Sequence, residues 1–368
     1  MKTQNPKSVS IVDVARAARV GVGTVSRVIN NQPNVSPATT QSVREAISLL
    51  NYRPLPSGSR RGPRLGGKHH RRGARSADVT LIVLAEYGLD WILQCAPVFA
   101  SVLHGMQSKT AELGCGLKIS QAADWEQLQA AMQQSPGGCL VLGEEPAGPP
   151  PKGIRPGQMV WVMGSVRRFG GDHVQPDHFN LGQLAGQYVL GRGHRHCAYL
   201  GAPVSPDYHV SFRGAAFQLC IASAGGSVEM LVDSGLVVSD RRSHAANEPV
   251  IARLLDRMLA VRPRVTALML QADILAPVVY SLLRERGVRP GQDVEILTCN
   301  NEPAYLSHLA PRPVVLDLRA ESIGKRAVEQ IHWRMKHPDE PAMRIMVEPG
   351  LLEAEAAPVI PAVPPARS

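Results

Sequence analysis

The sequence predicts a small all-α module at the amino terminus, followed by a large α/β body of two lobes. Residues 10–50 contain three short stretches in which apolar residues recur at helical spacing. From Ala77 onward, apolar strands alternate with amphipathic helices. This alternation is typical of parallel sheets that are covered on both faces. With 368 residues, the chain is long enough for one such sheet in each of two lobes.

The first two helices of the module have the pattern of a helix-turn-helix. Ser10 is a good N-cap, and Asp13 lies where a negative charge suits the first turn. The apolar face of this helix consists of Ile11, Val14, Ala15 and Ala18. The turn is expected at residues 19–21, where Gly21 permits a sharp reversal, and the second helix over residues 22–30. Such a pair of helices places its second member in the major groove of DNA.

The second helix is expected to have a buried face and a DNA face. The inward residues are Val25, Val28 and Ile29, and those left for DNA are Gly23, Thr24, Ser26, Arg27 and Asn30. The guanidinium fork of Arg27 can pair with guanine, which predicts direct base readout; a phosphate contact is the alternative. Val22 can touch a thymine methyl group, and Gly23 lets the backbone approach closely.

A third helix is expected to begin after Ser36, because Pro37 suits the first helical position. Its buried stripe consists of Val43, Ala46, Ile47 and Leu50. Pro54 ends the module, which is therefore assigned to residues 1–54.

Charge divides the chain into two parts. Residues 1–75 hold fourteen Lys and Arg residues but only two acids, Asp13 and Glu45, which gives a net charge of +12. Because the whole chain carries +9, residues 76–368 carry −3. A strongly basic head on a nearly neutral body favours nucleic-acid binding by the head.

The expected elements of the body follow one another in order along the chain. Strands are expected at 79–85, 117–120, 139–143, 159–164, 197–201, 228–232, 267–271, 294–299, 314–318 and 345–347. An extended piece is expected to reach Asp177. Helices are expected at 99–113, 125–134, 181–190, 212–224, 249–261, 274–286 and 323–335. The body is assigned to residues 78–356, the basic linker to 55–77 and a disordered tail rich in Pro and Ala to 357–368.

Cysteine usage and hydropathy predict a cytoplasmic protein. The six cysteines are scattered with no C-x-x-C spacing, as expected of reduced and mostly buried thiols. No signal-peptide core and no apolar run of membrane-spanning length is present in the sequence. His194 and His196 lie in a turn with no acidic or thiolate neighbour in sequence, which favours a loop over a metal site. We expect no cofactor, no metal and no membrane partner.

The motifs of the module resemble those of the LacI/GalR (lactose-repressor/galactose-repressor) family. Residues 13–30 read D-V-A-x-x-A-x-V-x-x-x-T-V-S-R-V-I-N, residues 35–39 read V-S-x-x-T, and residues 50–54 read L-N-Y-R-P. The body is similar to the same family in segments 174–177, 193–201, 211–214, 268–273 and 287–297. The resemblance implies an all-α helix-turn-helix headpiece joined to a two-lobed, periplasmic-binding-protein-like (type I) effector domain.

The resemblance also implies a function and a set of site residues. The expected protein is a dimeric transcriptional regulator, a repressor rather than an activator, that binds a double-stranded operator and has no enzymatic activity. A small effector, a sugar or sugar derivative, binds between the lobes. The DNA-binding residues implied are Ser10, Val22, Gly23, Thr24, Ser26, Arg27, Asn30, Asn34, Ser36, Thr39, Tyr52, Arg60 and Arg61. Those implied for the effector are Trp91, Phe99, Asp177, Arg213, Asp273 and Asn300.

Several of these assignments leave alternatives open. Trp91 and Phe99 can stack on a sugar ring or pack in the core, and Asp177 can line the cleft or cap the next helix. Asn300 and Asn301 stand where the family usually has aspartates, which removes negative charge from the expected cleft. That exchange keeps a second hypothesis open, in which the regulator has no small effector and answers to a protein partner.

The linker departs from the family pattern of a short hinge helix. Residues 55–67 are rich in Pro and Gly, which disfavours a helix. Two interpretations remain: a flexible basic linker, or an arginine-rich arm that lies in a narrow minor groove. Leu65 could act as a wedge between base pairs, although nothing in the sequence fixes its position.

Overall fold

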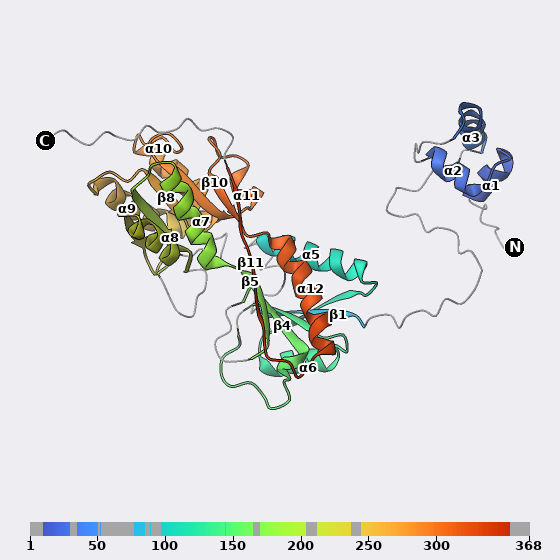
Figure 1. The fold of residues 1–368 in the computed structure, drawn as a ribbon, viewed down its shortest axis with the longest axis horizontal. Coiled ribbons are helices and arrows are strands. Elements are labelled where there is room, and N and C mark those ends of the chain that lie inside the picture. The colour runs from blue at the N-terminus through green and yellow to red at the C-terminus, as the bar shows by residue number, and fades with distance from the viewer. Residues whose placement is uncertain are drawn as a thin grey trace. The chain divides into compact units, whose positions relative to one another are not determined.

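The computed structural model describes residues 10–29, 35–50, 52, 77–84, 89, 97–143, 145–164, 170–203, 212–236 and 244–353. The chain divides into two compact units, Met1–Arg72 and Gly73–Ser368 (Figure 1). The division falls inside the basic segment that the sequence assigns to a linker.

Three helices form the described part of the first unit: α1 (Ile11–Ala17), α2 (Val22–Ile29) and α3 (Pro37–Leu49). They pack around a core in which Val14, Val25 and Val43 are fully buried. The predicted caps are confirmed. Ser10 and Asp13 form a reciprocal capping box on α1, and the Ser36 hydroxyl accepts a hydrogen bond from the Thr39 amide at 3.2 Å. Asn30 and Asn34 lie outside the described residues.

The turn between α1 and α2 is made by a different residue from the one expected. Arg19 adopts a left-handed conformation with φ 54°, whereas Gly21 does not have a positive φ. The Val20 amide donates to the Ala15 carbonyl and the Arg19 amide to the Arg16 carbonyl. This pair of bonds is a Schellman motif, which places the left-handed residue directly after the C-cap. The assignment of the reversal to Gly21 was therefore wrong.

The second unit contains two six-stranded sheets in its described residues. The first sheet is entirely parallel, in the order β11-β5-β4-β3-β1-β2. Its strands are β1 (Val79–Leu84), β2 (Leu117–Ala122), β3 (Cys139–Gly143), β4 (Met159–Val162), β5 (Asp172–Pro176) and β11 (Arg344–Val347). The continuous burial of β1 and β4 explains why these strands are apolar except for Thr80.

The second sheet has the order β12-β10-β9-β8-β6-β7, and only the pairing of β12 with β10 is antiparallel. Its strands are β6 (His196–Gly201), β7 (Ser227–Val232), β8 (Ala267–Leu270), β9 (Glu295–Asn300), β10 (Val314–Asp317) and β12 (Gly350–Leu352). Helices α7 (His178–Gly191), α8 (Phe212–Ser223), α9 (His244–Ala260), α10 (Ala276–Glu285) and α11 (Pro303–Leu306) belong to this lobe.

Each lobe is built from discontinuous parts of the chain. Helices α5 (Val98–Glu112) and α6 (Trp125–Gln133) share the first lobe with α12 (Ala320–Lys336), which follows β10 of the second sheet. Figure 1 shows the red-orange α12 beside the cyan α5. The chain crosses between lobes from β5 to α7, from β10 to α12 and from β11 to β12. The two-lobed α/β prediction is confirmed.

Two glycines allow α5 and α12 to pack closely. A Cβ atom on Gly105 of α5 would lie 2.0 Å from the Glu321 carbonyl oxygen of α12. A Cβ atom on Gly324 of α12 would lie 2.0 Å from the Val102 carbonyl oxygen of α5. Either distance is far below van der Waals contact, so the helix backbones meet only because both residues lack a side chain.

Some boundaries differ from expectation. Helix α9 begins at His244 rather than at Pro249, which lies inside it. Proline favours the first helical position, whereas five residues of α9 precede Pro249 in the structure. The short elements α11 and β12 were not predicted, because four and three residues are too few to show a period.

Five of the six cysteines lie among the described residues. Free thiols occur at Cys115, Cys139, Cys197, Cys220 and Cys299, of which the second, third and fifth are buried. Cys95 lies outside the described residues. Within the described ranges, no helix combines the length and apolar character needed to cross a membrane.

Candidate DNA interface and effector pocket

The outer face of α2 is open and carries one cation. Gly23 and Arg27 are exposed, and a Cβ atom on Gly23 would meet nothing within 4 Å. Val22 is half-buried and packs against the core of the module, so only part of its side chain is left for a base. Arg27 is thus the exposed side chain on this face that offers hydrogen-bond donors.

The other predicted DNA residues have structural contacts of their own. The Ser10 hydroxyl lies 2.6 Å from the Asp13 carboxylate, and the Ser36 and Thr39 hydroxyls are 2.8 Å apart. Tyr52 packs against the core of the module, whereas Thr24 and Ser26 are half-buried. Arg60 and Arg61 fall outside the described residues, together with Leu65 and the rest of the linker.

The structure brings Arg213 and Asn300 together at the carboxyl ends of the second sheet's strands. Arg213, on α8, is almost completely buried. Its Nη1 donates to the Gln271 carbonyl at 2.6 Å and to Asn300 Oδ1 at 3.1 Å, and its Nε lies 3.1 Å from Nδ1 of His178. Ligands of open α/β sheets bind outside this end of the strands. The guanidinium therefore fixes the amide of Asn300 at the expected effector position.

Asp273 is close to this group but is turned into the protein. It is fully buried, with Oδ1 accepting from the Thr298 hydroxyl at 2.8 Å and Oδ2 accepting from the Glu302 amide at 2.6 Å. Burial raises the pKa of this carboxyl well above its ordinary value. Both oxygens are occupied within the lobe, so Asp273 holds the turn after β9 and offers no free oxygen to a ligand.

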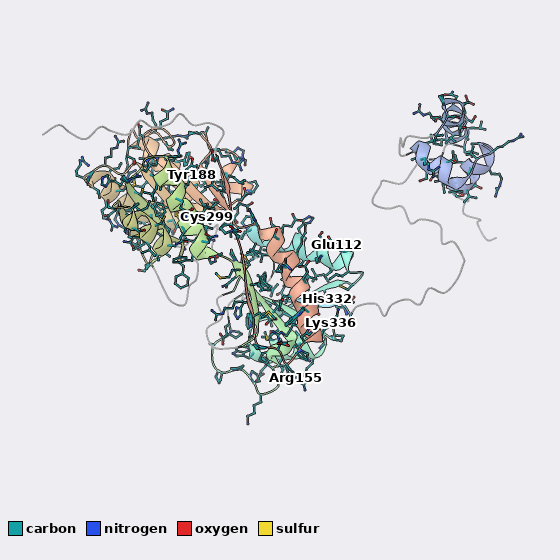
Figure 2. All side chains as sticks on the ribbon, in the orientation of Figure 1. Glu112, Arg155, Tyr188, Cys299, His332 and Lys336 are labelled. Carbon is teal, nitrogen blue, oxygen red and sulfur yellow. The ribbon has the colours of Figure 1, made fainter. Side chains whose placement is uncertain are left out.

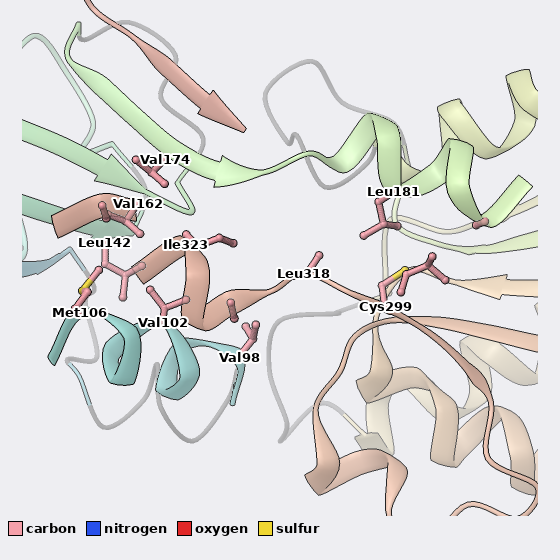
Figure 3. Close-up of a cluster of buried hydrophobic side chains, with 14 of the residues drawn as sticks. Val98, Val102, Met106, Leu142, Val162, Val174, Leu181, Cys299, Leu318 and Ile323 are labelled. Carbon is pink, nitrogen blue, oxygen red and sulfur yellow. The ribbon is translucent and has the colours of Figure 1, made fainter. Parts of the chain in front are cut away.

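Glu302 is a site residue that sequence analysis missed. It is buried, and its Oε1 accepts from the Val98 amide at 2.9 Å while its Oε2 accepts from Asn300 Nδ2 at 3.0 Å. Burial raises the pKa of its carboxyl. The available signal was its position directly after Asn300 and Asn301 at the end of a strand. Cys299, which precedes this turn, marks it in Figures 2 and 3.

A pocket of about 570 Å³ adjoins Asn300 and Glu302. Its walls come from three segments: Pro97, Val98, Ala100, Ser101 and His104; Asn300–Pro303; and Asp317 with Arg319–Ser322. Asn300, Asn301 and Arg319 have positive φ values of 111°, 67° and 54°. Strained backbone of this kind gathers at binding sites and hinges, and the volume suits a small ligand.

Asp177 and Phe99 both make structural contacts within the body. Asp177 caps α7, with its carboxylate accepting from the Asn180 amide at 2.9 Å, so the capping alternative is confirmed. Phe99 is half-buried and packs against the core of the body, as the packing alternative expects. Figure 3 shows the neighbouring Val98 at the end of α5 that faces Leu318 and Cys299. Trp91 is not among the described residues.

His194 belongs to a buried polar cluster at the opposite ends of the strands. Its Nε2 lies 2.7 Å from Glu295 Oε2 and its Nδ1 lies 2.9 Å from the Thr266 hydroxyl. Tyr188, labelled in Figure 2, and Arg192 also donate to Glu295, each at 3.0 Å. Among the described residues, no group of three or more His, Cys, Asp or Glu side chains is arranged to hold a metal.

Two family models match the chain. The model of bacterial regulatory proteins, lacI family, matches residues 10–55, and that of the periplasmic binding protein-like domain matches residues 187–353. The ribose operon repressor of Escherichia coli (strain K12) is 25% identical over 353 residues, which cover 94% of this chain and 98% of that protein. The regulator CelR of Thermobifida fusca is 25% identical over 356 residues, covering 93% and 96%.

Solved structures show the same fold. A complex of the transcriptional regulator CelR with cellobiose matches with a TM-score of 0.57 and 22% identity, covering 94% of this chain and 99% of that one. The Lac repressor dimer bound to operator and the anti-inducer ONPF matches with a TM-score of 0.55 and 16% identity, covering 95% and 98%. Both the headpiece and the body of the expected architecture are therefore confirmed. Residues 10–55 thus match the model of the lacI family of bacterial regulatory proteins, and the chain is similar to regulators of this kind along nearly its whole length.

Proposed function

We propose that this protein is a transcriptional repressor that binds a near-palindromic operator as a dimer and is controlled by a small carbohydrate effector. The observation that carries the proposal is the exposed face of α2, on which Gly23 leaves room for DNA and Arg27 supplies a guanidinium. Two such heads on a dimer read half-sites about one helical turn apart. The proposal assigns no catalytic step to the body.

Arg27 is the residue to which we assign base recognition. A bidentate arginine–guanine pair discriminates against the wrong base by about 1–3 kcal/mol, whereas a phosphate contact weakens binding to all sequences alike. The operator can be found by selecting bound fragments from a randomised duplex library with the full chain. We expect Arg27→Ala to lower the ratio of specific to non-specific affinity by about tenfold or more.

Arg44→Ala is the matched control for this experiment. Arg44 is also exposed, but it lies on α3 rather than on α2. We expect its loss to leave the specificity ratio unchanged, even if it weakens binding overall. Equal losses by Arg27→Ala on the selected site and on unrelated duplex would contradict base recognition and leave Arg27 as a phosphate contact.

The effector is assigned to the pocket beside Asn300. The proposal is supported by the buried guanidinium of Arg213, which holds this amide in place, and by relatives and neighbours that are named for, or bound to, ribose and cellobiose. An effector changes operator affinity only by binding one lobe arrangement better than the other. Calorimetry with ribose, cellobiose and a wider sugar library, followed by operator titration with each binder, tests this assignment.

Arg213→Lys and Arg213→Ala are expected to abolish the effector response, because neither side chain can bridge Gln271, Asn300 and His178 at once. Arg253→Ala is the control, since this exposed arginine lies on α9 and pairs with Asp233 at 3.5 Å. A normal effector response in a folded Arg213 variant would contradict the assignment. Flat calorimetry across the library with intact operator binding would favour control by a protein partner.

A further inference from the structure

A continuous chain of hydrogen bonds runs from Arg213 in the second lobe, through Asn300 and Glu302 in the pocket wall, to Val98 in the first lobe. Arg213 Nη1 donates to Asn300 Oδ1 at 3.1 Å, and Asn300 Nδ2 donates to Glu302 Oε2 at 3.0 Å. The other carboxylate oxygen of Glu302 accepts from the backbone amide of Val98 at 2.9 Å. Arg213, Val98 and Glu302 are buried, whereas Asn300 is half-buried, so the Glu302–Val98 bond is shielded from water and the two bonds of Asn300 are partly shielded. Charge-assisted bonds of this kind are among the stronger ones in proteins.

The last bond in this chain joins the two lobes. Glu302 follows β9 of the second sheet, whereas Val98 is the first residue of α5, which packs against α12 in the first lobe. No side chain caps the amino terminus of α5 from its own N-cap residue, Pro97. The carboxylate of Glu302 takes that place from across the lobes, and a negative charge suits the amino end of a 15-residue helix.

Each of these bonds has a fixed donor and acceptor, so Asn300 and Glu302 must be an amide and a carboxylate respectively. Asn300 must accept from Arg213 and donate to Glu302, which an amide can do and a carboxylate cannot. Glu302 must accept from both Asn300 and Val98, which a carboxylate can do and an amide cannot. An aspartate at position 300 would place two carboxylates about 3.0 Å apart in a partly buried site.

We propose that Glu302 is a positioning residue that ties the second lobe to the amino terminus of α5, and that Asn300 passes effector binding to this tie. The regulatory part rests on the proposed function, whereas the tie itself does not. Asn300 lines the pocket, so a ligand that takes over its amide competes for the group that holds Glu302. Effector binding then changes the strength of the link between lobes.

A double-mutant cycle in the full chain without effector tests the tie. In Glu302→Gln, the side-chain oxygen of the new amide can accept from Val98. Its NH2 group then faces the NH2 group of Asn300, and no hydrogen bond forms between the two donors. Asn300→Asp leaves two carboxylates facing each other. In the double variant, the new carboxylate accepts from Arg213 and from the new amide, whose oxygen accepts from Val98. All three hydrogen bonds are then restored, and the negative charge lies at position 300 instead of position 302.

Hydrogen exchange of a peptide that contains Val98 is the measurement. We expect each single variant to exchange the Val98 amide about tenfold or more faster than the parent protein, and the double variant to return to within about threefold of it. Glu321→Gln is the matched control. Glu321 lines the same pocket, but it is exposed and its carboxylate pairs with Lys325 at 2.6 Å. It should leave Val98 exchange unchanged.

The outcomes separate this inference from the proposed function. The tie would be overturned if Glu302→Gln leaves Val98 exchange unchanged. It would also be overturned if the rate increases of the two single variants simply multiply in the double variant. If the cycle shows rescue but none of the sugars binds the parent protein, the proposed carbohydrate effector fails and the tie stands. If a sugar binds and leaves Val98 exchange unchanged, the regulatory part is overturned. A change in Val98 exchange that the sugar causes in the parent protein but not in Glu302→Gln supports the regulatory part.

Discussion

Arg19 holds the turn of the helix-turn-helix in a conformation that favours glycine. Its φ is 54°, and the bonds on either side of it fix the angle between α1 and α2. A residue with a Cβ atom is disfavoured there by about 1–2 kcal/mol, although glycine is itself more flexible in the unfolded chain. The orientation of the helix that faces DNA therefore depends on a strained backbone position.

Arg19→Gly is expected to stabilise the module by about 0.5–1 kcal/mol, because the relief of strain outweighs the added freedom of the unfolded chain. Hydrogen exchange of the α1 and α2 amides in the full chain measures this change. Gly21→Ala serves as the comparison. A Cβ atom there meets nothing within 4 Å, so we expect no loss of stability. Destabilisation by Gly21→Ala together with no gain from Arg19→Gly would contradict the assignment of the turn.

Residues with local signals could be predicted from the sequence, and those with distant partners could not. Ser10 and Ser36 were recognised as caps because a cap depends on residues three positions away. Arg213 and Asn300 were identified through family motifs. Glu302 was missed because its partner Val98 lies 204 residues away. Asp273 carried the same kind of signal as Asn300, yet its contacts turn it inward, which the linear pattern does not encode.

At the scale of elements, a buried ion pair attaches α12 to β5. Arg334 Nη2 and Nε donate to the two oxygens of Asp172 at 2.6 and 2.9 Å, and the Met343 amide and Gln330 add further bonds at 2.8 and 2.5 Å. Burial alone raises the pKa of Asp172, but the bonds from Arg334, Gln330 and Met343 outweigh it and leave this pKa below its ordinary value. The pair fixes the end of the helix whose beginning lines the effector pocket.

Removing one partner of this pair should destabilise the body strongly. We expect Arg334→Met to lower the free energy of unfolding by about 3–5 kcal/mol, because it leaves the Asp172 charge buried without its cation. Arg326→Ala is the control on the same helix, since its pair with Glu329 is exposed and should contribute little. Thermal unfolding of the full chain, followed for the body's transition, distinguishes the two variants. Similar effects would contradict a special role for the buried pair.

The same pair predicts a pH dependence. The pKa of Asp172 is lower in the folded than in the unfolded protein, so its stabilising contribution is present above the unfolded pKa of about 3.9. That contribution is lost as the pH falls through the lower, folded pKa. In Asp172→Asn, this part of the acid sensitivity should be absent. An unchanged slope of stability against pH below about pH 4 would contradict this account.

The pattern of elements was largely predictable because apolar spacing is a local property. Strand β3 matches its expected range, and α5 and α12 differ from theirs by a few residues at the ends. The start of α9 was wrong because Pro249 was expected at the first helical position, whereas the helix begins five residues earlier. The close contact of α5 with α12 was not predicted. It depends on Gly105 and Gly324, which carry no distinguishing signal in the sequence and meet only in the fold.

At the scale of the whole molecule, charge and architecture separate two tasks. The first 75 residues carry +12 and the remainder carries −3, so attraction to a polyanion is confined to the headpiece and linker. The body offers a pocket between lobes that are each built from separate chain segments. The alternation of strands and helices predicted two sheets. It did not predict which segments share a lobe, because two of the three crossings return the chain to a lobe that it has already left.

The most direct test of the central claim is the salt dependence of binding between the full chain and its selected duplex. Each phosphate neutralised by the protein contributes about −0.9 to the slope of log affinity against log salt concentration. We predict a slope of about −5 or steeper, together with tighter binding to the selected site than to unrelated duplex at every salt concentration. Binding that is absent, or that does not change with salt, would contradict the claim that this basic helical module holds operator DNA.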